Sequence, residues 1–109
     1  MNNREIDRLV AEKVMGYRFD SNKRTLYKNI GHGWENPVFD FRPSEDISNA
    51  WEVVEKLEFD VKVTKCKSFV GYQCHIFIPD NVQMCFAETA PMAICLAALK
   101  SVGVDVSQE

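Results

Sequence analysis

The chain has 109 residues, of which 46% are hydrophobic and 27% are charged. This is the composition of an ordinary soluble domain with a sizeable core, which excludes an intrinsically disordered chain. The length leaves too few residues for two domains of usual size, so residues 1–109 are expected to form a single domain. No run approaches the ~18 apolar residues of a membrane helix, and no signal peptide is recognisable, so a cytoplasmic protein without membrane association is expected.

The charge balance argues against a nucleic-acid-binding role. Thirteen Lys and Arg residues face sixteen Asp and Glu residues, for a net charge of −3. Domains that bind nucleic acid by neutralising phosphates usually have the opposite balance. An excess of basic over acidic side chains occurs near the N-terminus, where Arg18, Lys23, Arg24 and Lys28 cluster. We interpret this cluster as a solvated surface, with a phosphate-binding patch as the alternative.

The sequence contains four cysteines, Cys66, Cys74, Cys85 and Cys95, with apolar or strand-like neighbours. No two of them have the close spacing of a zinc knuckle or of a thioredoxin-type active site. In a reducing cytoplasm they are expected to be free thiols that behave as small hydrophobic side chains. The expected strand pairing sets His75 opposite Cys85. Cysteines on the two outer strands would flank this histidine rather than converge on a metal ion, so neither a metal nor a cofactor is expected.

The first half of the chain begins with a helix over residues 3–15. Asn2 or Asn3 can cap it, Gly16 ends it, and a single apolar stripe follows the helical period at Ile6, Leu9, Val10 and Val14. Residues 17–43 show no sustained period, although they are rich in aromatic side chains. They are predicted to form a long loop, and an unstructured span of this length is unusual unless it is functional.

A second helix is predicted over residues 44–58, with Ser44 at its start and acidic residues in its first turn. Its apolar positions share one face, which is interpreted as facing the core: Ile47, Ala50, Trp51, Val54 and Leu57.

Three β-rich runs follow, over 61–67, 69–78 and 82–87, and predict an antiparallel meander. A last helix is predicted over 89–102, with Thr89 as its N-cap and Pro91 in its first turn.

The predicted register pairs Ile78 with Val82 across the second turn. It gathers one apolar face of the meander, at Val61, Val63, Cys74, Ile76, Ile78, Val82, Met84 and Phe86. The opposite face is mixed, and the first helix or the long loop is expected to cover part of it. The fold class is therefore α+β, as a three-layer α/β/α sandwich in the order α, long loop, α, β, β, β, α. Because the loop would cover the mixed face, a monomer is favoured slightly over a homodimer.

Three blocks of sequence resemble one known family. They are REID with LVAEKVMG in residues 4–16, DI with AWEVVEKL in 46–57, and TAP with AIC and AAL in 89–99. Together they resemble the small phage and prophage proteins grouped as the phage ABA sandwich domain family. The resemblance implies an α/β/α fold and a bacteriophage or prophage origin. It brings no assigned activity and no catalytic residues.

The candidate binding residues lie in the 17–43 segment. His32 and Trp34 stand in a glycine-rich stretch that offers an imidazole, an aromatic platform and close backbone approach. Tyr17 and Arg24 complete the set. This segment is interpreted as a binding site for a protein or a small molecule, with a loop pinned by one tryptophan as the alternative.

We interpret the chain as an accessory phage or prophage protein in the cytoplasm of the bacterial host. Its expected role is to bind an unknown host or phage protein, with no catalysis of its own, because no catalytic motif appears. Two other functions stay open. The order of elements is also that of double-stranded-RNA-binding domains, and an antitoxin-like partner of a small toxin has a comparable layout.

Overall fold

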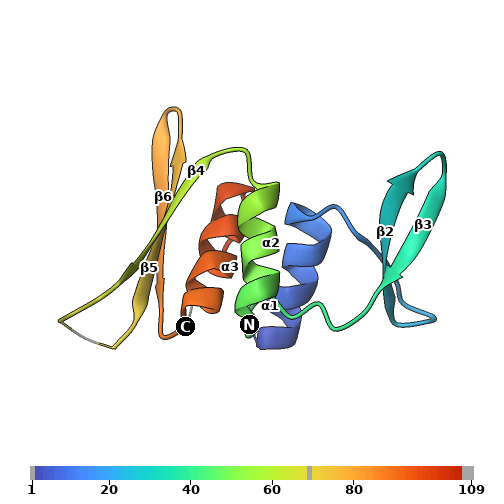
Figure 1. The fold of residues 1–109 in the computed structure, drawn as a ribbon, viewed down its shortest axis with the longest axis horizontal. Coiled ribbons are helices and arrows are strands. Elements are labelled where there is room, and N and C mark those ends of the chain that lie inside the picture. Colours follow the sequence, from blue (N-terminus) through green and yellow to red (C-terminus); the bar gives the residue numbers. More distant parts are fainter. Residues whose placement is uncertain (1, 69, 107–109) are drawn as a thin grey trace.

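The computed structural model describes residues 2–68 and 70–106. Within them the chain forms three α-helices and two three-stranded antiparallel sheets, which confirms the α+β class. Figure 1 shows the helices grouped in the middle of the molecule, with one sheet at each end of its longest axis. The layers therefore run sheet, helices, sheet, in place of the expected helices on both faces of the second meander.

The helix predicted over residues 3–15 is confirmed. Helix α1 (Asn3–Leu9) continues directly into η1 (Val10–Val14), a π-helical turn. The Oδ1 atom of Asn2 accepts the Glu5 N–H at 2.8 Å, and this cap satisfies a donor that the first turn leaves open. Gly16 then takes φ +75°, a left-handed conformation that ends the helix.

The prediction of a long loop over residues 17–43 is wrong. This segment forms the sheet β1–β2–β3, with strands β1 (Arg18–Asp20), β2 (Thr25–Gly31) and β3 (Trp34–Val38). The strands are short and most of their residues are exposed, so their alternation of polar and apolar side chains is weak. Such strands are stabilised by pairing with each other. The periodicity of side chains along a single strand does not reveal this pairing.

Local turn chemistry builds both hairpins of this sheet. The carboxylate of Asp20 accepts the N–H groups of Asn22 and Lys23, and this closes the turn from β1 to β2. His32 and Gly33 both have positive φ, at 56° and 81°. Two consecutive left-handed residues are what a type I′ turn needs, so they join β2 to β3 as a tight hairpin.

Helix α2 (Ile47–Lys56) begins three residues later than predicted. Its N-cap is Asp46, whose carboxylate accepts the Ser48 and Asn49 N–H groups at 2.8 and 3.2 Å. Ser44 is instead buried before the helix. The interpretation of Trp51 as a core residue is also wrong, since 53% of it is exposed. The buried face of α2 is narrower than its apolar stripe.

The second sheet, β4–β5–β6, confirms the predicted meander with strands β4 (Asp60–Lys65), β5 (Tyr72–Ile78) and β6 (Asn81–Ala87). Phe69, where the second strand was predicted to begin, lies outside the described residues. The predicted register of β6 is wrong by one residue, because a two-residue turn pairs Ile78 with Asn81. A shift of one residue reverses the faces of a strand, so Val82 and Met84 point away from the core.

Helix α3 (Ala90–Ser101) is the centre of the core and confirms the predicted last helix. The hydroxyl of Thr89 accepts the Met92 N–H at 3.3 Å, and residues 93–99 are all buried. One side of α3 packs against β4, β5 and β6, and another packs against α2 and η1. Sheet β1–β3 lies beyond α1 at the opposite end (Figure 1). The expectation that residues 17–43 cover the mixed face of the meander is therefore wrong.

The cap of α2 gives a first prediction. Asp46→Ala should lower the free energy of unfolding by about 1 kcal/mol, because two N–H groups of the first turn lose their acceptor. Ser48→Ala, two residues after the cap at an exposed position, should change it by less than about 0.5 kcal/mol. Urea denaturation followed by circular dichroism measures both. Equal stability of the two variants would contradict the capping role.

Candidate functional site

The sheet β1–β3, residues 18–38, projects from the helices, and we call it the arm (Figure 1). Its root is aromatic. The rings of Tyr17 and Phe41 meet edge to face at 5.4 Å, and the Tyr17 N–H donates to the Ala11 carbonyl at 2.8 Å. Burial raises the pKa of the Tyr17 phenol, with Glu52 adding to the rise. These contacts fix the arm to η1 at the point where the chain enters and leaves it.

One ion pair ties the three strands of the arm together. Nε and Nη2 of Arg18, on β1, donate to the two carboxylate oxygens of Glu35, on β3, at 3.0 and 2.9 Å. The guanidinium crosses the middle strand above the Tyr27 ring, 4.7 Å from its centre. The pair lowers the pKa of Glu35 and raises that of Arg18. A bidentate pair restricts strand movement even where solvent screens its energy.

The tip of the arm carries exposed apolar side chains. Trp34 follows the His32–Gly33 turn and is 70% exposed, and Ile30 precedes the turn and is 52% exposed. The Asn29 side chain accepts the Gly31 N–H at 2.8 Å, next to an irregularity in the β2–β3 pairing. The tip therefore presents a tryptophan on a turn whose backbone is fixed.

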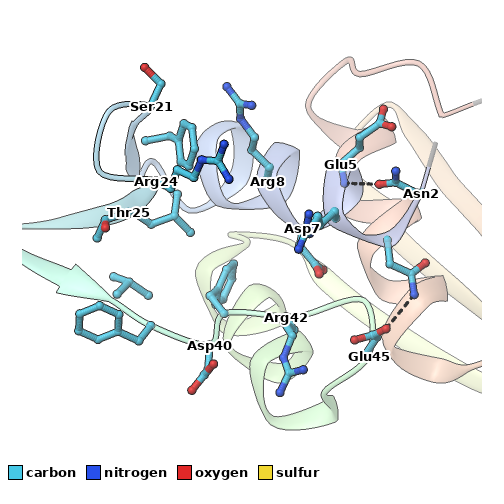
Figure 2. Close-up of a pocket in the computed structure, with 17 residues that line it drawn as sticks. Asn2, Glu5, Asp7, Arg8, Ser21, Arg24, Thr25, Asp40, Arg42 and Glu45 are labelled. Atoms are coloured by element: carbon cyan, nitrogen blue, oxygen red, sulfur yellow. Dashed lines mark hydrogen bonds between the residues drawn. The ribbon is translucent and has the colours of Figure 1, made fainter.

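An open groove of about 990 Å³ lies between α1 and the base of the arm. Phe19 and Phe39 supply apolar lining, and Arg8 lies over the Phe19 ring at 4.3 Å from its centre. Figure 2 shows Arg24 extending from the β1–β2 turn toward the part of α1 that bears Arg8. Asp40 lines the other side. The groove thus offers charges of both signs around an aromatic lining.

Two residues that line this groove have a strained backbone. Arg24 and Asp40 have φ of 52° and 55°, in the left-handed region that side chains with a Cβ rarely occupy. Arg24 immediately precedes β2 and Asp40 follows β3 by two residues. Such conformations cost free energy and are concentrated at functional sites.

Asp7 lines the groove and is hydrogen-bonded to the segment that precedes α2. Its Oδ1 atom accepts the backbone N–H of Ser44 at 2.8 Å. Burial raises the pKa of this carboxyl above its usual 3.8, against the lowering effect of the Ser44 hydrogen bonds. The carboxylate holds together two segments that are 37 positions apart in the sequence.

The four residues predicted as a binding site do not form one pocket. His32 and Trp34 are neighbours at the tip of the arm, Tyr17 is at its root, and Arg24 lines the groove. The seven residues of β2 separate Arg24 from His32, and eight steps of about 3.3 Å per residue span roughly 26 Å. The structure distributes these residues over the tip, the root and the groove.

Sequence reasoning missed most residues of the groove. Arg8 belongs to a helix that was interpreted only by its apolar stripe, and Arg42 and Asp40 stand in no motif. The aromatic lining had a signal, because Phe19 and Phe39 contribute to the aromatic richness of the 17–43 segment. Tertiary packing brings α1 to these residues. No local sequence pattern predicts this packing.

The cysteines and His75 are arranged differently from the expected register. Cys74 pairs with Cys85 on the inner face of β4–β6, whereas His75 lies on the outer face opposite Met84. The predicted facing of His75 and Cys85 is wrong. All four cysteines are free, and in residues 2–68 and 70–106 no group of three His, Cys, Asp or Glu side chains could hold a metal ion. Burial raises the pKa of Cys74 to about 12 and also raises that of Cys85 and Cys95.

The order and packing of these elements place the chain among small α+β sandwich proteins. Residues 8–99 match the phage ABA sandwich domain, so the chain belongs to this family of phage-associated proteins. It is similar to a phage protein from Bacillus cereus of known crystal structure. The two are 44% identical, the match covers 94% of this chain and 93% of the other, and the TM-score is 0.74.

A search among curated proteins found no match. Across the described part of the chain, no helix has the length and apolar character needed to cross a membrane.

The raised thiol pKa values predict slow alkylation. The thiolate is the reactive form, so buried Cys74 and Cys95 should react with iodoacetamide at pH 8 at least about tenfold more slowly than the partly exposed Cys66. Peptide mass spectrometry of the native protein over time measures the order. In urea the four rates should converge, and fast native labelling of Cys74 would contradict its burial.

At Asp7, the effect of the charge on stability can be tested separately from the effect of the hydrogen bond. Its raised pKa means that the folded state holds this proton more tightly than the unfolded chain. Lowering the pH from the folded pKa to 3.8 should therefore stabilise the fold through this group. The carboxyl ¹³C resonance of Asp7 should titrate with a midpoint above 3.8.

Substitution of the same residue tests its acceptor role. Asp7→Asn keeps an oxygen for the Ser44 N–H, whereas Asp7→Ala leaves this donor without its acceptor and should cost about 1–3 kcal/mol in unfolding free energy. Equal stability of the two variants would contradict the role of this hydrogen bond.

Proposed function

We propose that this phage-associated protein acts by binding another protein through the arm, in the cytoplasm of the bacterial host and without catalysis of its own. The observation that carries the proposal is the exposure of Trp34 at the end of a projecting sheet. Tryptophan is among the residues that most often dominate the binding free energy of protein interfaces. An exposed tryptophan that is not packed against the core favours a role in recognition.

The construction of the arm supports this role. A binding side chain loses less entropy on association when its backbone is already fixed. The type I′ turn and the Arg18–Glu35 pair hold Trp34 in this way. The groove at the base of the arm adds charges of both signs that can orient a partner.

The edges of the arm indicate which atoms would make the contact. Strand β1 has three residues, and β3 contains Pro37 and Glu35. A short strand, a proline and a charge all oppose the addition of another strand. The partner is therefore expected to contact side chains of the tip and the groove, and not to extend the sheet by backbone pairing.

The proposal predicts that Trp34→Ala abolishes binding without unfolding the chain. The tagged full-length protein and the variant should be used to capture proteins from a lysate of phage-infected bacteria, followed by quantitative mass spectrometry. Loss of a hot-spot side chain worth about 2 kcal/mol lowers occupancy of a specific partner about 30-fold at limiting concentration.

Val70→Ala is the matched control, because Val70 is 87% exposed and belongs to the other sheet's first turn. A protein captured by wild type and by this control, and lost with Trp34→Ala, is then tested directly. In Trp51→Phe, the fluorescence of the remaining Trp34 should shift to shorter wavelength when that purified protein is added. Equal capture by Trp34→Ala and Val70→Ala, or no spectral shift, would refute the proposal.

A further inference from the structure

Three arginines line the groove between α1 and the base of the arm. Arg4 and Arg8 come from α1, and Arg24 comes from the turn between β1 and β2. Arg4 and Arg8 are one helical turn apart, an arrangement of like charges that destabilises a helix. Figure 2 shows the Arg24 side chain directed toward Arg8. We call Arg8 and Arg24 the arginine pair. Their mutual repulsion is removed when an anion lies between them.

Most hydrogen-bond donors of the arginine pair are unused. Nε of Arg8 donates to Glu12 at 2.8 Å, and within residues 2–68 and 70–106 its two Nη atoms have no acceptor. The Arg24 side chain has no acceptor among these residues either. The Phe19 ring supports the Arg8 guanidinium, whose Cζ lies 4.3 Å from the ring centre. Planar guanidinium groups with free N–H groups suit the two oxygens of a carboxylate.

The acidic residues of the groove do not neutralise the arginine pair. The Asp7 carboxylate accepts the Ser44 N–H, and Oε1 of Glu45 accepts from the Asn3 amide at 3.0 Å. Figure 2 shows Asp40 and Glu45 across the groove from the arginine pair. The groove is therefore polarised, with positive charge beside the β1–β2 turn and negative charge on the opposite side.

An apolar surface adjoins the arginine pair. Phe19 and Phe39 both line the groove, and 73% of Phe39 is exposed. Covering such a ring with an apolar side chain removes its surface from water and is favourable. The groove has a volume of about 990 Å³ and is open, so a segment of polypeptide chain can lie along it. Its lining offers contacts for both charged and apolar side chains of that segment.

We propose that the groove takes an extended segment of the partner protein in which an aspartate or glutamate adjoins an apolar side chain. The carboxylate lies between the guanidinium groups of Arg8 and Arg24, and the apolar side chain packs on Phe39. Recognition of acidic motifs by clustered arginines is a known mode of peptide binding. This inference rests on the proposed function and adds the chemistry of the segment that is bound.

The other charges of the groove favour a protein segment over a nucleic-acid strand. A nucleic acid carries a phosphate at every nucleotide, so several phosphates would come close to Glu5, Asp40 and Glu45. A protein segment can carry one carboxylate and present neutral or basic side chains to these acids. The net charge of −3 also opposes the approach of a polyanion.

Titration of the ¹⁵N-labelled full-length protein with a synthetic peptide tests the proposal. The probe is a capped hexapeptide in which phenylalanine and leucine have a glutamate on each side, so it offers the same chemistry in either direction. The Nε–Hε signals of Arg8 and Arg24 should shift, with a dissociation constant of about 1 mM or lower. The same peptide with glutamine in place of both glutamates should bind at least about fivefold more weakly.

Arg24→Gln and Lys23→Gln form a matched pair of variants. Each removes one positive charge from an exposed position, but Lys23 lies outside the lining of the groove. Arg24→Gln should weaken binding of the glutamate peptide by about fivefold or more, and Lys23→Gln by less than about twofold. The NMR spectra also show that both variants fold. Equal effects would overturn the proposal, because they would indicate a general attraction of charge.

Three other results would also overturn it: no shift at the arginine pair with about 5 mM peptide, equal binding of the glutamine peptide, or equal shifts with inorganic phosphate at the same concentration. Trp34→Ala should bind the peptide as the wild type does. Peptide binding without any captured partner would therefore refute only the proposed function. Capture that depends on Trp34, without peptide binding, would refute only this inference.

Discussion

Burial of α3 is the constraint on which the rest of the structure depends. Residues 93–99 form two successive turns with no solvent-facing side, so apolar surface must meet this helix from every direction. The β4–β6 sheet covers one side, and α2 with η1 covers another. The alanines of this stretch, Ala93, Ala97 and Ala98, let neighbouring elements approach closely. Because one helix takes all of this packing, each sheet is left with a face or an end that the core does not use.

The two sheets differ in how they use that freedom. The arm has edges that resist pairing and a tip that exposes Trp34, while β4–β6 has an uncharged strand at its edge and an outer face that exposes Phe77, Val82 and Met84. Nothing in the core requires either surface. They lie at opposite ends of the molecule (Figure 1), so a contact at one does not obstruct a contact at the other.

Ionisable groups have distinct tasks in this arrangement. Asp7 joins α1 to the segment before α2 at the cost of a partly desolvated carboxylate, and the Arg18–Glu35 pair joins strands of the arm in solvent. The buried thiols stay protonated at neutral pH because burial disfavours the thiolate. The groove is different, since Arg24 and Asp40 bring charge to a strained backbone beside open space. The groove therefore brings charges of both signs together at the base of the arm.

The sequence by itself determined the elements whose signals are local. Caps such as Asn2 and Thr89, helical spacing and strand alternation predicted three helices and the second meander, because each signal involves residues within one or two turns of each other. Tertiary structure decided the rest. Residues 17–43 become an arm only when three weak strands pair with each other. A turn shorter by one residue reversed β6 and exposed Met84. Arg24 was assigned to a site on sequence grounds, but its neighbour Arg8 reaches that site only through packing of α1. The strand register, the burial of individual side chains and the approach of residues distant in the sequence are set by non-local contacts. A pattern along the chain does not report them.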